Sequence, residues 1–250
     1  MKNIKKKRSK ILVPIIICAV VIISILLFLS ARYLTAMASM RPLPSQEVTT
    51  DVFSINNSFV NLYLLKSGEK YIAFDAGSDV KATEQALNGF GIDESDISAL
   101  FLTHTDYDHV AAVPLFSSAD VYMAQSNKAF IEKASGRSRS KAFVDMGRDY
   151  KTMADGEAVT VAGTEIQCIF TPGHTDGSAS YVVNGRYLFT GDTLRLKNGE
   201  VTLFFAVFNM NDEEQKQSIS KLTALSGIEA VFTMHTGYTT DFSGAFSKIK

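Results

Sequence analysis

The sequence predicts a mixed α/β fold of the α+β type, preceded by one N-terminal transmembrane helix. Residues 11–31 form an apolar run without charged groups, long enough for one membrane-spanning helix. From Val48 onward, short runs rich in β-branched and aromatic residues alternate with segments of helical spacing. The 46% hydrophobic and 20% charged residues are typical of a globular protein with enough apolar material for a core.

The N-terminal segment predicts that the rest of the chain is exported. Residues 1–10 carry six basic groups and no acid, and Ile11–Leu29 is uncharged and rich in Ile, Val and Leu. At about 1.5 Å per helical residue this run spans about 28 Å, close to the thickness of a hydrocarbon core. The positive-inside rule then gives a single-pass protein of the cell membrane, with residues 1–10 in the cytoplasm and the domain outside.

A cleaved signal peptide is the alternative interpretation of this segment. Ala36-Met37-Ala38 resembles a cleavage site, and cleavage after Ala38 would release a secreted domain. The apolar run is longer than a usual signal-peptide core, which favours an uncleaved anchor. The predicted organisation is a basic cytoplasmic segment, a transmembrane anchor or uncleaved signal, a tether and one domain, at residues 1–10, 11–31, 32–47 and 48–250.

The charge of the chain indicates which partners it binds, and the positions of its two cysteines indicate whether they form a disulfide. Residues 11–250 carry 19 basic and 26 acidic groups, and an acidic body argues against binding of nucleic acid. Cys18 lies in the apolar N-terminal run and Cys168 in a strand-like run, so we expect no disulfide between them. A small-molecule substrate and a membrane are the expected partners, and the sequence leaves the oligomeric state open.

The elements of the domain follow from hydrophobic period and turn residues. A hairpin of strands at 59–66 and 71–74, preceded by a strand at 48–55, ends at Asp75-Ala76-Gly77. Residues 135–150 are basic and without clear period, and predict a surface loop or lid. Helices are expected at 81–90, 126–134 and 212–225, and further strands at 97–103, 121–124, 159–161, 165–170, 179–183, 187–190 and 230–233.

Residues 103–110, Thr-His-Thr-Asp-Tyr-Asp-His-Val, place four candidate metal ligands within six positions. The side chains of His104 and Asp106 can point the same way at a strand end, while Asp108 and His109 come from the turn or helix start that follows. One short segment can therefore supply ligands to two adjacent metals. Imidazole and carboxylate suit zinc, iron or manganese.

Three more candidate ligands lie in turns further along the chain. His174 follows Pro172-Gly173, Asp192 follows a strand in Thr-Gly-Asp-Thr, and His235 follows the last predicted strand. The chain has four histidines, and all four fall in these motifs. Random placement would rarely produce this coincidence, so we predict one binuclear metal site.

This ordered set resembles the metallo-β-lactamase superfamily. The family motifs are H-x-H-x-D-H, a distal Gly-His, a Gly-Asp at the bridging ligand and a final His, and Asp75-Ala76-Gly77 matches an upstream Asp-x-Gly. The resemblance covers Val48 to the C-terminus and implies a four-layer αββα sandwich. It also implies a first metal site of His104, Asp106 and His174, a second of Asp108, His109 and His235, and Asp192 as the bridge.

Asp106 departs from the family pattern, which has histidine at that position. The carboxylate adds negative charge and hardness at the first site. The resemblance implies two divalent ions, with Zn²⁺ expected, and Asp106 favours Mn²⁺ or Fe more than an all-histidine site would.

The resemblance implies metal-assisted hydrolysis. A hydroxide held between the metals would attack an ester, lactone, thioester, amide or phosphodiester, because metal binding lowers the pKa of water toward about 7. Asp108 is the expected catalytic residue, binding the second metal and taking or relaying a proton. A diiron oxidoreductase or dioxygenase with the same ligands, and a metal-binding module without catalysis, are the alternatives.

Expected contacts beyond the metals are less specific. Thr202–Met210 is Phe-rich, and its Phe205 and Phe208 would line an acyl or aromatic pocket or belong to the core. Tyr107 and Tyr238 flank the metal motifs and would hydrogen-bond a substrate oxyanion or simply pack. Asp75 and the hydroxyls of Thr103 and Thr193 are candidates for orienting the imidazoles from behind.

Overall fold

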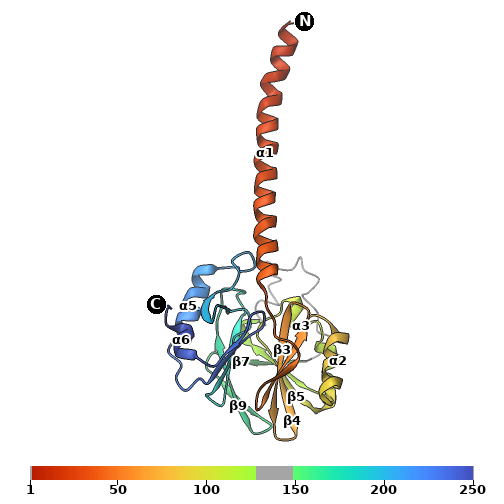
Figure 1. Cartoon of the computed structure of the whole chain (residues 1–250), viewed down its shortest axis with the longest axis vertical. Coiled ribbons are helices and arrows are strands. Elements are labelled where there is room, and N and C mark those ends of the chain that lie inside the picture. The colour runs from red at the N-terminus through yellow and green to blue at the C-terminus, as the bar shows by residue number, and fades with distance from the viewer. Residues whose placement is uncertain (1, 128–148, 250) are drawn as a thin grey trace. The chain divides into compact units, whose positions relative to one another are not determined.

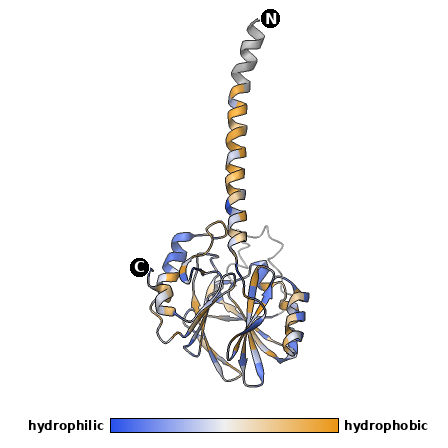
Figure 2. Ribbon diagram, viewed as in Figure 1, coloured by the Kyte–Doolittle hydropathy of each residue, from blue (hydrophilic) through white to orange (hydrophobic). Residues whose placement is uncertain are grey.

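The computed structural model describes residues 2–127 and 149–249, and the chain divides into two compact units, residues 1–39 and 40–250. The first unit is one helix, α1 (Lys2–Ser39). Its segment Val13–Ser39 is long and apolar enough to cross a membrane, a property that a signal sequence shares. Figure 2 shows this segment as a mostly orange run.

Helix α1 continues beyond the predicted anchor. Residues 32–39 were expected to begin a tether, but they are helical, and residues from Met40 onward belong to the second unit. The residues after position 31 explain the continuation, because most of them have high helix propensity and the next proline is Pro42.

The second unit is built on two β-sheets (Figure 1). Within the described residues, the first sheet has seven strands, antiparallel from β1 to β4 and parallel from β4 to β7. Their order in the sheet is the order in the chain: β1 (Gln46–Thr49), β2 (Val52–Asn57), β3 (Val60–Ser67), β4 (Lys70–Phe74), β5 (Ile97–Leu102), β6 (Asp120–Ala124) and β7 (Lys151–Met153).

The second sheet has six strands in the described part of the chain, all antiparallel except the pair β11 and β14. In sheet order they are β15 (Gly237–Thr239), β14 (Ala230–Thr233), β11 (Tyr187–Phe189), β10 (Ala179–Val183), β9 (Thr164–Phe170) and β8 (Ala158–Val161). A separate hairpin joins β12 (Leu194–Lys197) to β13 (Glu200–Leu203).

The two sheets pack face to face through an aromatic core. The rings of Phe74 from the first sheet and Phe189 from the second stack with centroids 3.9 Å apart and an interplanar angle of 4°. Phe101 and Tyr181 form an edge contact across the same interface. All four side chains are fully buried. Stacked aromatic rings therefore fix the two sheets against one another.

Helices cover the outer faces of both sheets. Leu87 of α2 (Val80–Phe90) is buried against the first sheet, and Leu222 of α5 (Asp212–Leu222) and Phe246 of α6 (Phe242–Phe246) against the second. This arrangement confirms the predicted four-layer αββα sandwich. Shorter helices connect the strands: α3 (Tyr107–Val110), η1 (Glu94–Asp96) and η2 (Val113–Leu115).

Element boundaries differ from the prediction where turns interrupt a run. The strand expected at 48–55 is split into β1 and β2 by a turn with an irregular register. The helix expected to end at 225 stops at Leu222, and its N-cap is Asn211. Most of the helix expected at 126–134 and of the lid at 135–150 lies outside the described residues.

Candidate metal centre

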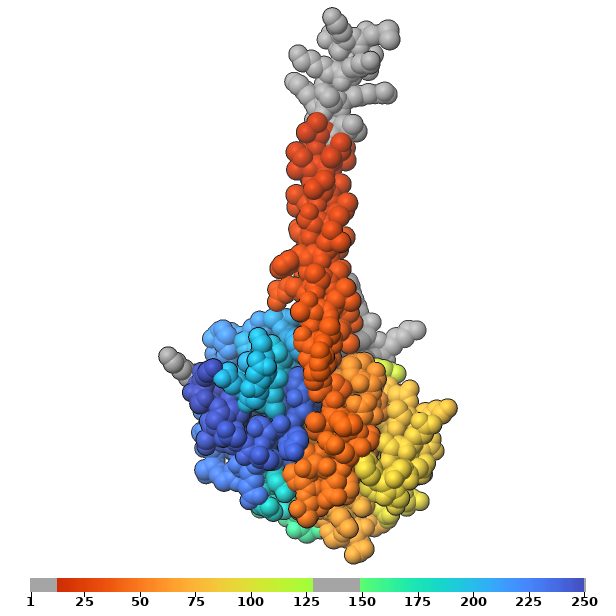
Figure 3. Space-filling model, in the orientation of Figure 1, coloured from red at the N-terminus to blue at the C-terminus, as the bar shows by residue number. Residues whose placement is uncertain are grey.

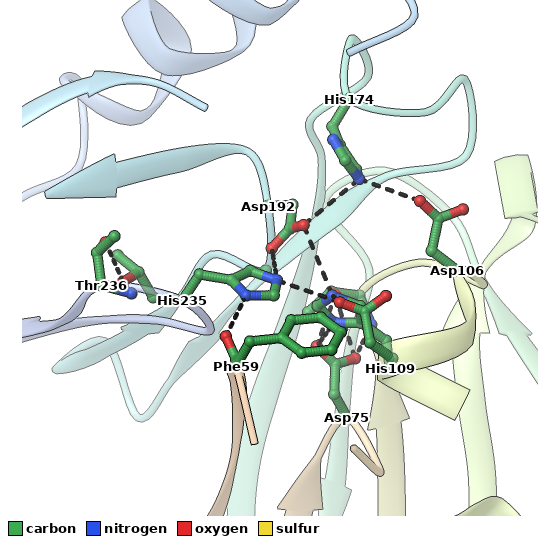
Figure 4. Close-up of polar contacts among 12 residues, drawn as sticks. Phe59, Asp75, Asp106, His109, His174, Asp192, His235 and Thr236 are labelled. Carbon is green, nitrogen blue, oxygen red and sulfur yellow. Dashed lines mark hydrogen bonds and ion pairs between the residues drawn. The ribbon is translucent and has the colours of Figure 1, made fainter. Parts of the chain in front are cut away.

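The seven predicted ligands lie in loops and in the short helix α3, at one edge of the two sheets. His104 follows β5, Asp108 and His109 belong to α3, and His174 follows β9. Asp192 follows β11, and His235 lies in the turn between β14 and β15. The alternation of strands and turns therefore brings separate loops to one place, where the ligand side chains converge (Figure 4).

Two glycines allow these loops to approach their neighbours. Gly173 and Gly191, which directly precede His174 and Asp192, have φ angles of 130° and 54°. A β-carbon at Gly173 would overlap the backbone nitrogen of Gln215, and one at Gly191 would overlap the Thr103 hydroxyl. Glycine therefore provides both the backbone conformation and the close contact.

His104, Asp106 and His174 form the first cluster. The Oδ2 atom of Asp106 lies 3.3 Å from Nε2 of His174 and 3.8 Å from Nε2 of His104. One ligand atom from each residue lies within 4.8 Å of the other two. Asp106, the residue that departs from the family motif, therefore stands beside two imidazoles, as a ligand at this position would.

Asp108, His109 and His235 form the second cluster. The Oδ2 atom of Asp108 lies 3.4 Å from Nε2 of His235 and 3.6 Å from Nε2 of His109. Both imidazoles are buried, whereas the Asp108 side chain is 21% exposed. The Asp108 carboxylate is therefore partly exposed to solvent, unlike the two imidazoles of this cluster.

Asp192 lies between the two clusters. Its Oδ2 atom is 3.5 Å from Nε2 of His174 and 3.6 Å from Nε2 of His109, while its Oδ1 atom is 3.3 Å from Nε2 of His235. One carboxylate thus faces imidazoles of both clusters, the arrangement expected of a bridging ligand.

The spacing of these atoms fits metal ions. Ligands at about 2.1 Å from a tetrahedral zinc ion lie about 3.4 Å from one another, and the Nε2-to-carboxylate distances of 3.3–3.8 Å match this value. Within the described residues, the Nε2 atoms of His104, His109 and His235 are buried without a hydrogen-bond partner. Buried polar atoms are normally paired, so cations are the partners that this site suits.

Hydrogen bonds behind His109 and His104 converge on one carboxylate. Nδ1 of His109 lies 2.8 Å from Oδ2 of Asp75, and Nδ1 of His104 lies 3.0 Å from the Thr103 hydroxyl. That hydroxyl donates to Asp75 in turn, at 2.8 Å. A carboxylate accepts these hydrogen bonds, so Nδ1 is the donor in both rings, and Nε2 is the atom of each ring that faces the site.

The other two imidazoles are held in the same way by neutral acceptors. Nδ1 of His235 donates to the carbonyl of Phe59 at 2.7 Å, and Nδ1 of His174 lies 3.3 Å from Oδ1 of Asn209. Asn209 also accepts from Gln215, whose Nε2 donates to the Asp192 carbonyl at 3.1 Å. The sequence analysis did not identify Phe59, Asn209 or Gln215 as partners, because no local motif marks them.

Of the three residues expected to orient the imidazoles, two do so. Asp75 and Thr103 contact imidazole nitrogens, but the Thr193 hydroxyl lies 2.7 Å from that of Thr171 and 3.4 Å from that of Ser180. Thr193 therefore belongs to a buried hydroxyl cluster behind the Asp192 turn.

Burial and the neighbouring carboxylates have opposite effects on the pKa values of the imidazoles. Burial lowers the pKa of His104 well below its usual value. Burial also opposes protonation of His109, but the carboxylates of Asp192 and Asp108 outweigh it and raise the pKa of His109 well above its usual value. The pKa of Asp192 is lowered well below its usual value because the cationic forms of His235 and His109 outweigh the effect of burial. The clustered carboxylates thus favour positive charge at this place.

Aromatic residues line part of the cluster, though not all those expected. Phe204 packs its ring edge against His174 with centroids 5.1 Å apart and contacts His235 at 5.3 Å. Phe205 and Phe208 both contact the ring of Phe204. Phe204, which the sequence did not single out, therefore contacts imidazoles of both clusters.

The two tyrosines differ in environment. The Tyr107 side chain, between Asp106 and Asp108 in the chain, is 52% exposed. Tyr238 stacks on Phe232 with ring centroids 5.9 Å apart and packs against the aromatic core. The packing alternative therefore holds for the Tyr238 ring, and Tyr107 is accessible to a substrate.

Comparison with known proteins identifies the family of this chain. The family model of the metallo-beta-lactamase superfamily matches residues 55–235. A probable metallo-hydrolase of Methanocaldococcus jannaschii is 30% identical over 153 residues, which are 61% of this chain and 64% of that protein. A probable polyketide biosynthesis zinc-dependent hydrolase of Bacillus velezensis is 31% identical over 132 residues, or 52% of each chain. The chain thus spans between half and two thirds of the length of these two relatives.

A solved structure shows the same fold. The metallo-beta-lactamase family protein of Thermus thermophilus superposes with a TM-score of 0.63 and 22% identity, covering 82% of this chain and 79% of that one. The family match includes every candidate ligand from His104 to His235. The chain belongs to the metallo-beta-lactamase superfamily.

Proposed function

We propose that this chain is a metal-dependent hydrolase with a two-metal centre. The observation that carries the proposal is the position of Asp192, whose two oxygens face imidazoles of the two clusters at 3.3–3.6 Å. The first metal would be held by His104, Asp106 and His174, the second by Asp108, His109 and His235, and Asp192 would bridge them. When bound, the ions supply Lewis-acid polarisation of the scissile bond and lower the pKa of water toward about 7.

In the proposed reaction, residues of the protein coordinate the metals and transfer a proton. Asp192 is 4% exposed and fixed by imidazoles on both sides, which suits a purely coordinating role. Asp108 is the more accessible carboxylate, and we assign it the transfer of a proton to the leaving group as well as metal binding. Phe204 excludes water from one side of the imidazoles.

The substrate class that we propose is a small molecule with an ester, lactone, thioester, amide or phosphodiester bond. The two curated relatives are named as hydrolases, and one is named as zinc-dependent. Zinc is therefore the first metal to test. Asp106 replaces an imidazole by a harder ligand, which favours Mn²⁺ or iron more than the usual family site does.

A substrate panel tests the hydrolase proposal. Purified protein would be assayed with chromogenic esters, lactones, thioesters, phosphodiesters and a cephalosporin, with Zn²⁺, Mn²⁺ and Fe²⁺ supplied in turn. We expect hydrolysis of at least one class and a loss of about 100-fold or more in the Asp108→Ala variant. Asp96→Ala is the matched control, because Asp96 pairs with Lys70 on the surface. Metal-loaded protein without hydrolysis but with iron-dependent redox bands would replace this proposal with an oxidoreductase.

We also propose that α1 anchors the domain in the cell membrane, with residues 1–10 in the cytoplasm and the domain outside. The apolar segment Val13–Ser39 and the six basic groups before position 11 support this orientation. The test is extraction of membranes with alkaline carbonate, combined with protease added outside intact cells. We expect the chain to stay in the membrane and its domain to be digested; a soluble domain starting at Ser39 would indicate cleavage instead.

A further inference from the structure

Residues 40–45 form an ordered segment that we call the N-terminal strap. The strap precedes β1 and has no regular secondary structure. It lies within the second compact unit and outside residues 55–235, where the family model matches. In Figure 3 the orange surface of the first strands lies beside the dark blue surface of the C-terminal part. The sequence predicts that this segment is a tether, but hydrogen bonds connect it to the domain along its length.

One end of the strap meets the turn that carries His235. The backbone N–H of Arg41 donates to the carbonyl of His235 at 2.7 Å. The neighbouring carbonyl in this turn, of Met234, accepts from the backbone N–H of Asn61 at 2.6 Å. Two consecutive carbonyls of the turn are thus held, one by the strap and one by β3.

The other end of the strap is fixed to the first sheet. The Asn61 side chain accepts from the Leu43 N–H at 2.7 Å and donates to the Leu43 carbonyl at 2.9 Å. Asn56 donates to the same carbonyl at 2.8 Å, and Ser54 donates to the carbonyl of Pro44 at 2.7 Å. The strap is therefore anchored on β2 and β3 by side chains that bind its backbone.

The Leu43 side chain completes the connection to the second sheet. It packs against the aromatic core, and its Cδ2 atom is 3.4 Å from the place of a β-carbon on Gly237. Gly237 begins β15, two residues after His235. The strap thus connects β2 and β3 of the first sheet to His235 and, through Leu43, to Gly237 at the start of β15.

We propose that the strap is a positioning element of the metal centre, acting on the second site through His235. This inference rests on the proposed two-metal function. His235 Nε2 must stay 3.3–3.4 Å from the oxygens of Asp192 and Asp108 to share a metal with them. The turn keeps this position only where hydrogen bonds fix its backbone, and the Arg41 amide fixes the carbonyl of His235 itself. Groups that orient ligands typically change metal affinity by about 10- to 100-fold.

Processing of the N-terminus would affect the strap differently at different cleavage sites. Cleavage after Ala38, the alternative considered for the N-terminus, leaves the whole strap on the domain. Removal of the first 45 residues would take away every strap hydrogen bond described above. A released domain that begins at Ser39 therefore keeps its second metal, whereas a shorter form loses affinity for it.

The test compares two substitutions of Arg41 in the full-length protein. Arg41→Pro removes the amide hydrogen that His235 accepts, while Arg41→Ala removes the same side chain and keeps that hydrogen. Metal-free protein of each variant would be titrated with Zn²⁺ alone by calorimetry, and bound zinc counted by mass spectrometry. We expect Arg41→Pro to bind the first zinc as Arg41→Ala does and the second about 10-fold or more weakly.

Equal affinity of the two variants for the second zinc would overturn the inference. Should Arg41→Pro fail to fold, Asn56→Ala decides instead, because it removes one bond to the Leu43 carbonyl and leaves Arg41 unchanged. Its second zinc should then bind several-fold more weakly than in wild type, and an unchanged value would count against the strap. A wild-type protein that binds fewer than two zinc ions would instead contradict the proposed function.

Discussion

Asp75 accepts a hydrogen bond from Nδ1 of His109 at 2.8 Å, and both side chains are completely buried. The same carboxylate accepts from the backbone N–H of Thr103 at 2.7 Å and from its hydroxyl at 2.8 Å. Through that hydroxyl it also reaches Nδ1 of His104. One residue that belongs to neither cluster therefore orients an imidazole of each. Asp75 adopts a φ of 60°, a conformation that its interactions must stabilise.

Asp75→Asn should weaken binding of both metals. The amide keeps one acceptor oxygen where the carboxylate has two, so it cannot accept from both Thr103 and His109 as Asp75 does. We expect zinc affinity to fall by about 10- to 100-fold in a folded protein. Calorimetric titration with Zn²⁺ measures the effect, with the exposed Asp93→Asn as control. Affinity equal to wild type would show that Asp75 has no orienting role.

Asn209→Leu should weaken the first metal selectively. It removes the Asn209 oxygen that lies 3.3 Å from Nδ1 of His174 and that accepts from Gln215, which also donates to the Asp192 carbonyl. We expect about a 10-fold loss in affinity for one zinc ion. The control is Asn88→Leu on the exposed face of α2. A uniform loss at both metals would point to disturbed packing of α5 rather than to His174.

Asp106→His should change metal preference. The substitution restores the residue of the family motif and replaces a hard oxygen ligand with an imidazole. We expect selectivity for Zn²⁺ over Mn²⁺ to rise by about 10-fold or more, on the scale of other changes around metals. Competition between the two ions in equilibrium dialysis gives the ratio. Unchanged metal content and ratio would remove Asp106 from the ligand set.

Metal binding should release protons, and more of them at neutral than at alkaline pH. The carboxylates raise the pKa of His109 well above its usual value and also raise the pKa of His235. A raised pKa keeps the proton on the imidazole to higher pH, and a metal needs the deprotonated ring. Zinc affinity should therefore fall as pH falls through this range. Calorimetry in buffers of different ionisation enthalpy counts the protons, and a release that stays the same over the whole pH range in which the protein is folded would contradict the assignment.

The ligands could be predicted because they are marked by local sequence. His104, Asp108, His174 and Asp192 each follow a strand within a short polar motif, and strand ends determine where such residues meet. The alternation of strands and helices predicted a mixed α/β fold, and the family resemblance of these motifs implied its four layers. Asp75 could be identified for the same reason, because it directly follows the second strand of a recognisable hairpin.

The partners behind the ligands could not be predicted because they depend on long-range docking. The Phe59 carbonyl lies 176 residues from His235 in the chain, and Asn209 lies 35 residues from His174. A backbone carbonyl carries no sequence signal. By contrast, the turn of the β12–β13 hairpin has a sequence signal that the prediction did not use. This signal is Asn198-Gly199, which lies between the paired residues Lys197 and Glu200 and has positive φ at both positions.

Counting bound metal tests the two-metal centre most directly. Purified full-length protein would be stripped of metal, titrated with Zn²⁺ and analysed by mass spectrometry under native conditions, beside the Asp192→Ala variant. The arrangement of Asp192 between two clusters predicts two zinc ions in the wild type and weakened binding of both in the variant. A folded wild-type protein that binds one zinc ion or none at saturation would contradict it.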